Sequence, residues 1–156
     1  MTRSAMMSRI GPKDTKPEIM VRKGLHRMGF RYRLHTKDLP GKPDIVLPKY
    51  RTVIFVHGCF WHGHEGCRYF RIPKTNTVFW QTKIGRNHER DAAVRQRLVE
   101  SGWRVLIVWE CAIRQVSEDF LIPVIADWLA GLENEASISE QNFFSRLEGK
   151  SCSRVK

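Results

Sequence analysis

The spacing of apolar residues changes along the chain between a helical and a strand-like period, which predicts alternating helices and strands. The first helix is expected from about residue 16, because Thr15 and Glu18 fit a capping box and a first-turn proline loses no intrahelical hydrogen bond. In this segment Val21, Leu25 and Met28 recur at spacings of four and three. In such a box the side chain of Glu18 bonds the backbone N–H of Thr15.

Short apolar runs predict the strands of a sheet. The run 30–34 alternates, as in a strand with one buried face, and follows Gly29, where the first helix is expected to end. Another strand is expected over 44–47. The runs 53–56 and 104–109 are apolar on both faces, which is typical of central strands covered by helices.

Two further helices are expected over about 77–101 and 118–131. Each has a stripe at helical spacing, formed by Asp91, Val94 and Leu98 in the first and by Phe120, Val124 and Trp128 in the second. The order of strands and helices predicts an α/β fold with a central mixed β-sheet flanked by helices.

The two ends of the chain lack this pattern. Residues 1–16 carry basic side chains among small and polar ones and are expected to form a flexible basic N-terminal arm. Residues 17–132 are expected to form one domain, and residues 133–156, rich in Ser, Glu, Gln and Lys, a weakly ordered C-terminal tail. A length of 156 residues suits a single domain.

The net charge of the chain indicates which class of molecule it binds. The chain has 27 Lys and Arg against 16 Asp and Glu, a formal net charge of +11. Such an excess attracts polyanions, of which nucleic acid is the commonest in the cytoplasm. A membrane surface is the alternative, but no segment combines a basic helical face with an aromatic one. Because we find neither a span of roughly 18–20 apolar residues nor a secretory signal, a cytoplasmic location without membrane contact is expected.

Cysteine and histidine gather after the run 53–56. Cys59, His64 and Cys67 lie within nine positions, and thiolate and imidazole ligands in a closed set of four suit a structural, tetrahedral zinc ion. Packing of buried cysteines is the alternative. The fourth ligand stays open among four residues, of which the first is favoured because it follows a strand end: Cys111, His57, His62 and Cys152. The spacing does not match the zinc-dependent base deaminases.

A carboxylate and two histidines are candidates for catalysis. Asp44 follows a turn and opens a strand, so it is either a turn-forming residue or a Mg²⁺ ligand. His57 ends the neighbouring strand, and His62 is a short loop away. Because histidine can move a proton near neutral pH, this set favours hydrolysis of a phosphodiester.

Aromatic residues occur next to this cluster. Phe60, Trp61 and Trp80 either pack in the core or, if exposed, stack on or wedge between bases. Lys83 and Asn87 follow Trp80 on the same expected helix and are candidates for contacts with phosphates or base edges.

Three segments together resemble one enzyme family. They are Pro40–Asp44 (PGKPD), Val53–His62 (VIFVHGCFWH) and Trp103–Cys111 (WRVLIVWEC). From about Met7 to Leu132 the chain resembles the very short patch repair (Vsr) DNA mismatch endonucleases, and the string HGCFWH is highly specific. The resemblance implies a restriction-endonuclease-like fold. It also implies that the chain nicks DNA on the 5′ side of the T in T·G mismatches, which arise where 5-methylcytosine deaminates at sites of a partner cytosine methyltransferase.

The resemblance further implies roles for individual residues. Asp44 would hold a catalytic Mg²⁺ together with the main-chain carbonyl of Val56, a position where some relatives have Thr. His62 would transfer the proton, and His57 and Glu18 would assist around the metal-bound waters and the phosphate. The implied ligands of the structural zinc are Cys59, His64, Cys67 and Cys111.

The same resemblance assigns the DNA contacts. Phe60, Trp61 and Trp80 match intercalating aromatic residues. The N-terminal arm, including Met7 and Ile10, matches a segment that reaches across the DNA, and Lys83 and Asn87 are retained as DNA-binding candidates. We expect a monomer associated with the bacterial nucleoid. Two alternatives remain, a restriction-type Mg²⁺-dependent nuclease that cuts paired duplex and a zinc-containing DNA-binding module without catalytic activity.

Overall fold

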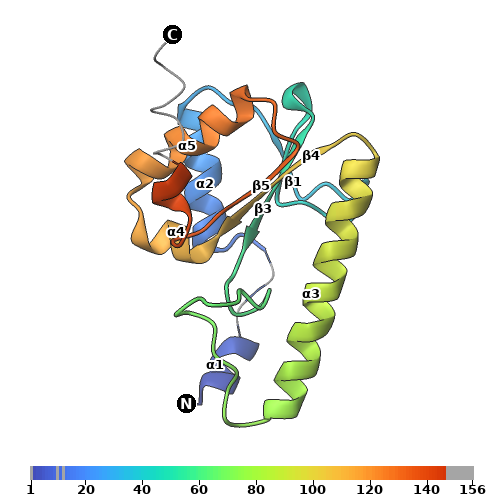
Figure 1. Cartoon of the computed structure of the whole chain (residues 1–156), viewed down its shortest axis with the longest axis vertical. Coiled ribbons are helices and arrows are strands. Elements are labelled where there is room, and N and C mark those ends of the chain that lie inside the picture. Colours follow the sequence, from blue (N-terminus) through green and yellow to red (C-terminus); the bar gives the residue numbers. More distant parts are fainter. Residues whose placement is uncertain (1, 10, 12, 147–156) are drawn as a thin grey trace.

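A mixed five-stranded sheet with helices on both faces organises the chain (Figure 1). The computed structural model describes residues 2–9, 11 and 13–146. In chain order the elements are α1 (Arg3–Ser8), α2 (Lys16–Arg27), β1 (Arg33–Leu34), β2 (Ile45–Leu47), the 3-10 turn η1 (Pro48–Tyr50), β3 (Thr52–His57), α3 (Thr77–Glu100), β4 (Arg104–Trp109), α4 (Glu110–Gln115), α5 (Glu118–Ala130) and β5 (Glu135–Ile138). The α/β class and the mixed sheet predicted from the sequence are confirmed.

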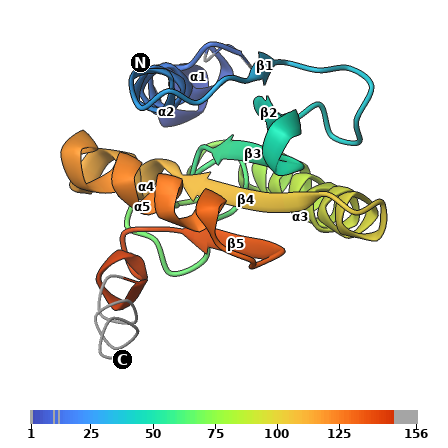
Figure 2. The same cartoon turned by 90° about the horizontal axis from the view of Figure 1, so that it is seen from above.

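The strands lie in the order β1-β2-β3-β4-β5. The pairs β1–β2 and β2–β3 are antiparallel, whereas β3–β4 and β4–β5 are parallel. Consecutive parallel strands need a long crossover connection, and α3 provides it between β3 and β4. In the view from above, α3 lies on one side of the sheet and α5 on the other (Figure 2).

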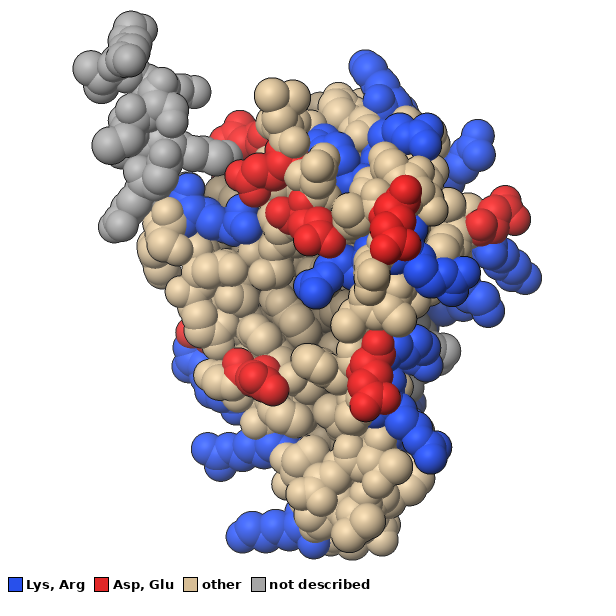
Figure 3. Space-filling model, turned by 45° about the vertical axis from the view of Figure 1, so that its right-hand side comes forward, with Lys and Arg blue, Asp and Glu red and all other residues tan. Residues whose placement is uncertain are grey.

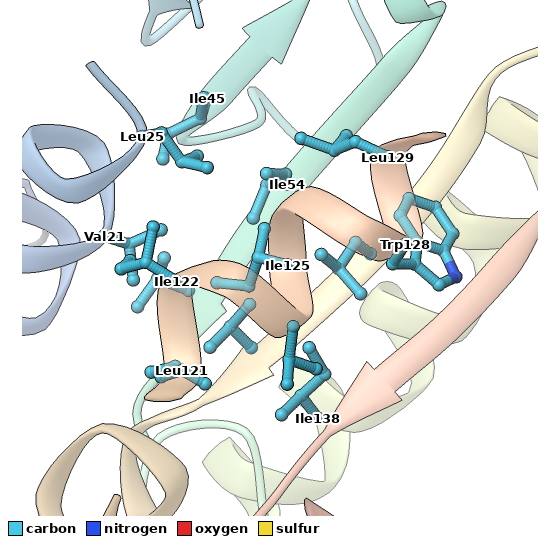
Figure 4. Close-up of a cluster of buried hydrophobic side chains, with 14 of the residues drawn as sticks. Val21, Leu25, Ile45, Ile54, Leu121, Ile122, Ile125, Trp128, Leu129 and Ile138 are labelled. Carbon is cyan, nitrogen blue, oxygen red and sulfur yellow. The ribbon is translucent and has the colours of Figure 1, made fainter. Parts of the chain in front are cut away.

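The two faces of the sheet have separate cores because side chains alternate along a strand. Ile54 and Val56 of β3 contact the core with α2 and α5, where Val21, Leu25 and Ile125 are fully buried (Figure 4). Gly24 permits this close helix contact, because a Cβ at that position would come within 2.5 Å of the Ile122 side chain.

The opposite face carries a smaller core. Val53 and Phe55 of β3 and Val105 of β4 pack there with Leu98 of α3. Every residue of β3 is buried, as the two-sided apolar run predicts. Packing against both faces of the sheet therefore holds the C-terminal end of β3 in place.

Local predictions of the elements are confirmed where a segment has a strong period. The helix predicted over 77–101 is α3, and the strand predicted over 104–109 is β4. The helix α2 ends near Gly29, whose φ of 93° is in the left-handed region that glycine tolerates. The strand predicted over 30–34 is shorter, because only Arg33 and Leu34 find partners on β2.

Two predicted stripes are each wrong in one member: Met28, the C-cap of α2, is 50% exposed, and Phe120 of α5 does not face the core. Phe120 is 64% exposed, whereas Val124 and Trp128 are buried. Three residues spaced by four drift around a helix with 3.6 residues per turn, so all three do not face the core. The buried face of α5 instead includes Leu121, Ile122 and Ile125.

The expectations for the chain ends need correction. Part of the N-terminal segment forms α1, whose N-cap Thr2 accepts a hydrogen bond from the Ala5 backbone N–H at 3.2 Å. Residues 135–138 form β5, which completes the sheet beside β4, and Phe143 is only 2% exposed. Tertiary contacts order both segments even though their local sequence pattern is weak. Residues 147–156, the rest of the expected tail, lie outside the described residues.

Positive charge is dispersed over one face of the molecule (Figure 3). On the face shown in Figure 3, Lys and Arg side chains lie mainly around the margins and are interspersed with Asp and Glu. Within the described residues, no helix is both long and apolar enough to cross a membrane.

Candidate functional site

Asp44 and Val56 meet where two antiparallel strands bring their ends together. Asp44 immediately precedes β2, and Val56 is the penultimate residue of β3. Oδ2 of Asp44 accepts a hydrogen bond from the Val56 backbone N–H at 2.8 Å. Burial, with the nearby charge of Glu18, raises the pKa of Asp44 to about 6 despite this hydrogen bond. A neighbouring cation would stabilise the ionised form of such a partly buried carboxylate.

Glu18 extends from the first turn of α2 into the same region, and its residue is only 4% exposed. Its carboxylate accepts hydrogen bonds from the Asp14 backbone N–H at 3.2 Å and from the Thr15 hydroxyl at 3.4 Å. The predicted capping box is therefore only half formed, because Thr15 caps the helix but Glu18 bonds the N–H of Asp14 instead of that of Thr15. Burial raises the pKa of Glu18.

The two candidate histidines form a stacked pair. The rings of His57 and His62 are 3.7 Å apart between centroids and nearly parallel, and the Trp109 ring makes a T-shaped contact with His57. His57 is 5% exposed, and this burial lowers its pKa well below the usual value. It is therefore uncharged at neutral pH, which leaves His62 as the better placed histidine for proton transfer.

Asp91 is a site residue that the sequence reasoning did not identify. Its Oδ2 lies 2.5 Å from Nδ1 of His62, although the two residues are 29 positions apart. A carboxylate at this nitrogen orients the imidazole and leaves Nε2 for chemistry. The sequence held one sign of this role. Asp91 shares a helical stripe with Val94 and Leu98, and an aspartate is unusual in a stripe whose other members face the sheet.

Four potential metal ligands converge beside this pair. Their ligand atoms all lie within 4.8 Å of one another, and the residues are Cys59, His64, Cys67 and Cys111. His57 and His62 belong to a different cluster with Asp91, so the structure favours Cys111 among the open choices for the fourth ligand. Cys152 lies outside the described residues.

The electrostatics of this cluster suit a soft cation. The Cys59 thiol hydrogen bonds to Cys111 and lowers the pKa of Cys111 to about 6, while the same bond raises the pKa of Cys59. The backbone N–H of Cys111 donates to Sγ of Cys59, and that of Glu140 donates to Sγ of Cys111, each at 3.3 Å. Three thiolates and one imidazole are the donor set of a closed tetrahedral zinc site.

The aromatic candidates form a buried cluster. Trp80 is 1% and Phe60 3% exposed, so of the two alternatives for these rings the structure shows packing in a core. The physical reason is α1: the Trp80 indole N–H donates to the Ser4 hydroxyl at 2.8 Å, and Met7 packs against the cluster. Trp61 is only partly buried.

The polar DNA-binding candidates line the edge of this cluster. The Lys83 ammonium lies 5.2 Å from the centre of the Trp61 ring, and the Asn87 side-chain amide donates to the Trp61 carbonyl at 3.0 Å. Asn87 thus holds the loop that carries Trp61. Ile10 lies outside the described residues.

A single large groove connects these features. Its volume is about 1720 Å³, and it brings together Asp44, Glu18 and His62 with Trp61 and Lys83. Further basic residues lining it are Arg3, Lys13, Lys16, Lys37, Lys42, Arg68, Arg90 and Arg114. A basic groove that contains carboxylates and a histidine oriented by a hydrogen bond is suited to cleaving a polyanion.

Comparison with known proteins agrees with this chemistry. Residues 1–68 match the family described as DNA mismatch endonuclease Vsr. The DNA mismatch endonuclease Vsr of Escherichia coli is 45% identical over 143 residues, which cover 90% of this chain and 91% of that protein. The type II nicking enzyme V.XorIIP of Xanthomonas oryzae pv. oryzae is 50% identical over 111 residues, or 71% of this chain and 81% of that enzyme. The type II nicking enzyme V.NmeAIP of Neisseria meningitidis is 53% identical over 112 residues, or 72% and 79% respectively.

Proposed function

The chain belongs to the Vsr family of DNA mismatch endonucleases and is a DNA-nicking endonuclease, and we propose that it cuts one strand on the 5′ side of the T in T·G mismatches. Such mismatches form when 5-methylcytosine deaminates. The proposed substrate is therefore double-stranded DNA with a T·G mismatch. The proposed functional partner is a DNA cytosine methyltransferase, which makes the 5-methylcytosine from which the mismatch arises. We place this activity in a monomer in the bacterial cytoplasm, at the nucleoid.

The observation that carries the proposal is the placement of Asp44, His62 and Glu18 in one basic groove. Asp44 and the Val56 main-chain carbonyl would hold a Mg²⁺ ion, which would lower the pKa of bound water and polarise the scissile phosphate. His62, oriented by Asp91, would move the proton. His57 would support the His62 ring as an uncharged stacking partner.

Structural zinc at Cys59, His64, Cys67 and Cys111 would fix the loop that carries the catalytic and aromatic residues. This loop contains both Trp61 and His62. A metal ion that stiffens the loop would therefore position the residue proposed to recognise the mismatch and the residue proposed to transfer the proton.

Recognition of the mismatch would use the aromatic cluster. A T·G pair is easier to unstack than a matched pair, and a wedge of Trp61, Phe60 and Trp80 would test that difference. Because α1 covers Trp80, DNA binding requires Ser4 and Met7 to release the cluster. Met7 and Ile10 would then contact the DNA, with Lys83 and Asn87 reaching phosphates or base edges.

Nicking of labelled duplexes that differ in a single T·G or T·A pair tests the proposal, with Mg²⁺ or with EDTA. We expect one Mg²⁺-dependent nick 5′ of the mismatched T, which Asp44→Ala abolishes without loss of binding. The matched control is Asp119→Ala, an exposed carboxylate of α5 that does not line the groove. Equal cutting of both duplexes would indicate a restriction-type nuclease, and binding without cutting would indicate a module without catalytic activity.

A further inference from the structure

A further group of potential metal ligands lies in the same groove. Nε2 of His35 is 3.2 Å from Oδ1 of Asp14 and 4.0 Å from Oε2 of Glu18, and all three donor atoms lie within 4.8 Å of one another. The residues come from three places: the segment before α2, the first turn of α2 and the residue after β1. Only the tertiary fold brings this set together.

The Glu18 carboxylate of this group is buried without a lysine or arginine partner among the described residues. The Glu18 side chain is 5% exposed, and among the ion pairs of residues 2–9, 11 and 13–146 its only partner is His35. Arg22 pairs with Asp14 at 2.7 Å and does not reach Glu18. A buried carboxylate without Lys or Arg is costly unless it becomes protonated or binds a metal.

The neighbouring Asp44 makes this imbalance larger. It is a further, partly buried carboxylate that lines the same groove as Glu18. Among the ion pairs of the described residues, Asp14 pairs with Arg22 and His35, Glu18 pairs with His35 alone, and Asp44 is in none.

We propose that Asp14, Glu18 and His35 bind a divalent transition-metal cation, at a site separate from the Mg²⁺ ligands Asp44 and Val56. Two carboxylates and an imidazole suit Mn²⁺ and its heavier neighbours, whereas Mg²⁺ prefers oxygen ligands alone. Arg22 and His35 both lie against Oδ1 of Asp14, so Oδ2 would bind the ion while Oδ1 keeps its bond to Arg22. The ion would face the groove and neutralise carboxylates that otherwise repel a DNA phosphate. That role in DNA binding rests on the proposed function, but binding of the cation does not.

Titration of the full chain with Mn²⁺ in the absence of DNA tests the proposal. Free Mn²⁺ is counted by electron paramagnetic resonance. We expect His35→Gln and Asp14→Asn each to weaken binding of one Mn²⁺ equivalent at least about tenfold, as loss of a ligand contact does. His88→Gln, which removes an exposed histidine of α3, is the matched control and keeps that equivalent.

Spectroscopy separates ligation from a general effect of charge. Electron spin echo modulation from imidazole nitrogen on bound Mn²⁺ is expected in the parent and in His88→Gln and is lost in His35→Gln. Unchanged Mn²⁺ binding and unchanged nitrogen modulation in His35→Gln would overturn the proposal. Because no DNA is present, the result does not depend on whether the chain nicks T·G mismatches.

Discussion

The backbone N–H of Val56 donates a 2.8 Å hydrogen bond to the Asp44 carboxylate, which joins the ends of β2 and β3. This one donor does not compensate for the burial of Asp44, so the pKa of the carboxyl stays at about 6. The group best placed to bind a metal is therefore also a source of instability in the metal-free protein.

Asp44→Asn should abolish Mg²⁺-dependent nicking and stabilise the metal-free protein at pH 7.5 by about 1–3 kcal/mol. The folded-state pKa of Asp44 lies above its usual value of 3.8, so the carboxyl loses its proton more readily in the unfolded chain. The parent thus loses stability as pH rises from about 4 to about 6, and the asparagine variant does not. Urea unfolding measures the difference, which should shrink at pH 4.5. Lower stability of the Asp44→Asn variant than of the parent at pH 7.5 would contradict this account.

Asp91→Asn should lower kcat about 10- to 100-fold with little change in DNA affinity, because it weakens the orientation of His62. Single-turnover nicking gives the rate, fluorescence anisotropy gives the affinity, and the pH profile of the rate should change. Glu89→Gln, an exposed neighbour on α3, serves as control. Equal losses of rate in both variants, or a loss confined to binding, would remove Asp91 from this role.

Cys111→Ser should reduce the zinc content and lower the melting temperature, because the bound ion contributes folding energy. Zinc is counted by mass spectrometry of the purified chain and stability by calorimetry. Cys152→Ser is the matched control and should retain one equivalent, since three other cysteines and His64 fill four coordination positions. Full zinc retention in Cys111→Ser would disprove the ligand set.

Ser4→Ala should loosen α1, because it leaves the buried indole N–H of Trp80 without its acceptor at a cost of about 1–3 kcal/mol. Tryptic cleavage after Arg9 should become roughly five- to a hundredfold faster, as local opening becomes more frequent. Ser8→Ala in the same helix is exposed and should cleave at nearly the parent rate. Identical rates in all three proteins would show that this hydrogen bond does not hold α1.

The sequence alone determined the elements whose period is strong. The strands 53–56 and 104–109 and the helix 77–101 could be predicted because their apolar spacing is local and long enough to be unambiguous. Three of the four potential metal ligands were also evident, since Cys59, His64 and Cys67 occupy one loop.

Only the tertiary structure decided which distant residues meet. Asp91 reaches His62 because α3 packs against the sheet, and a helical stripe cannot reveal such a partner across 29 positions. The burial of Trp80 depends on α1, whose six residues are too few to form a stable helix without tertiary contacts. Local sequence thus determined the elements and their chemistry, whereas packing between elements decided which carboxylate faces which histidine and which aromatic rings are covered.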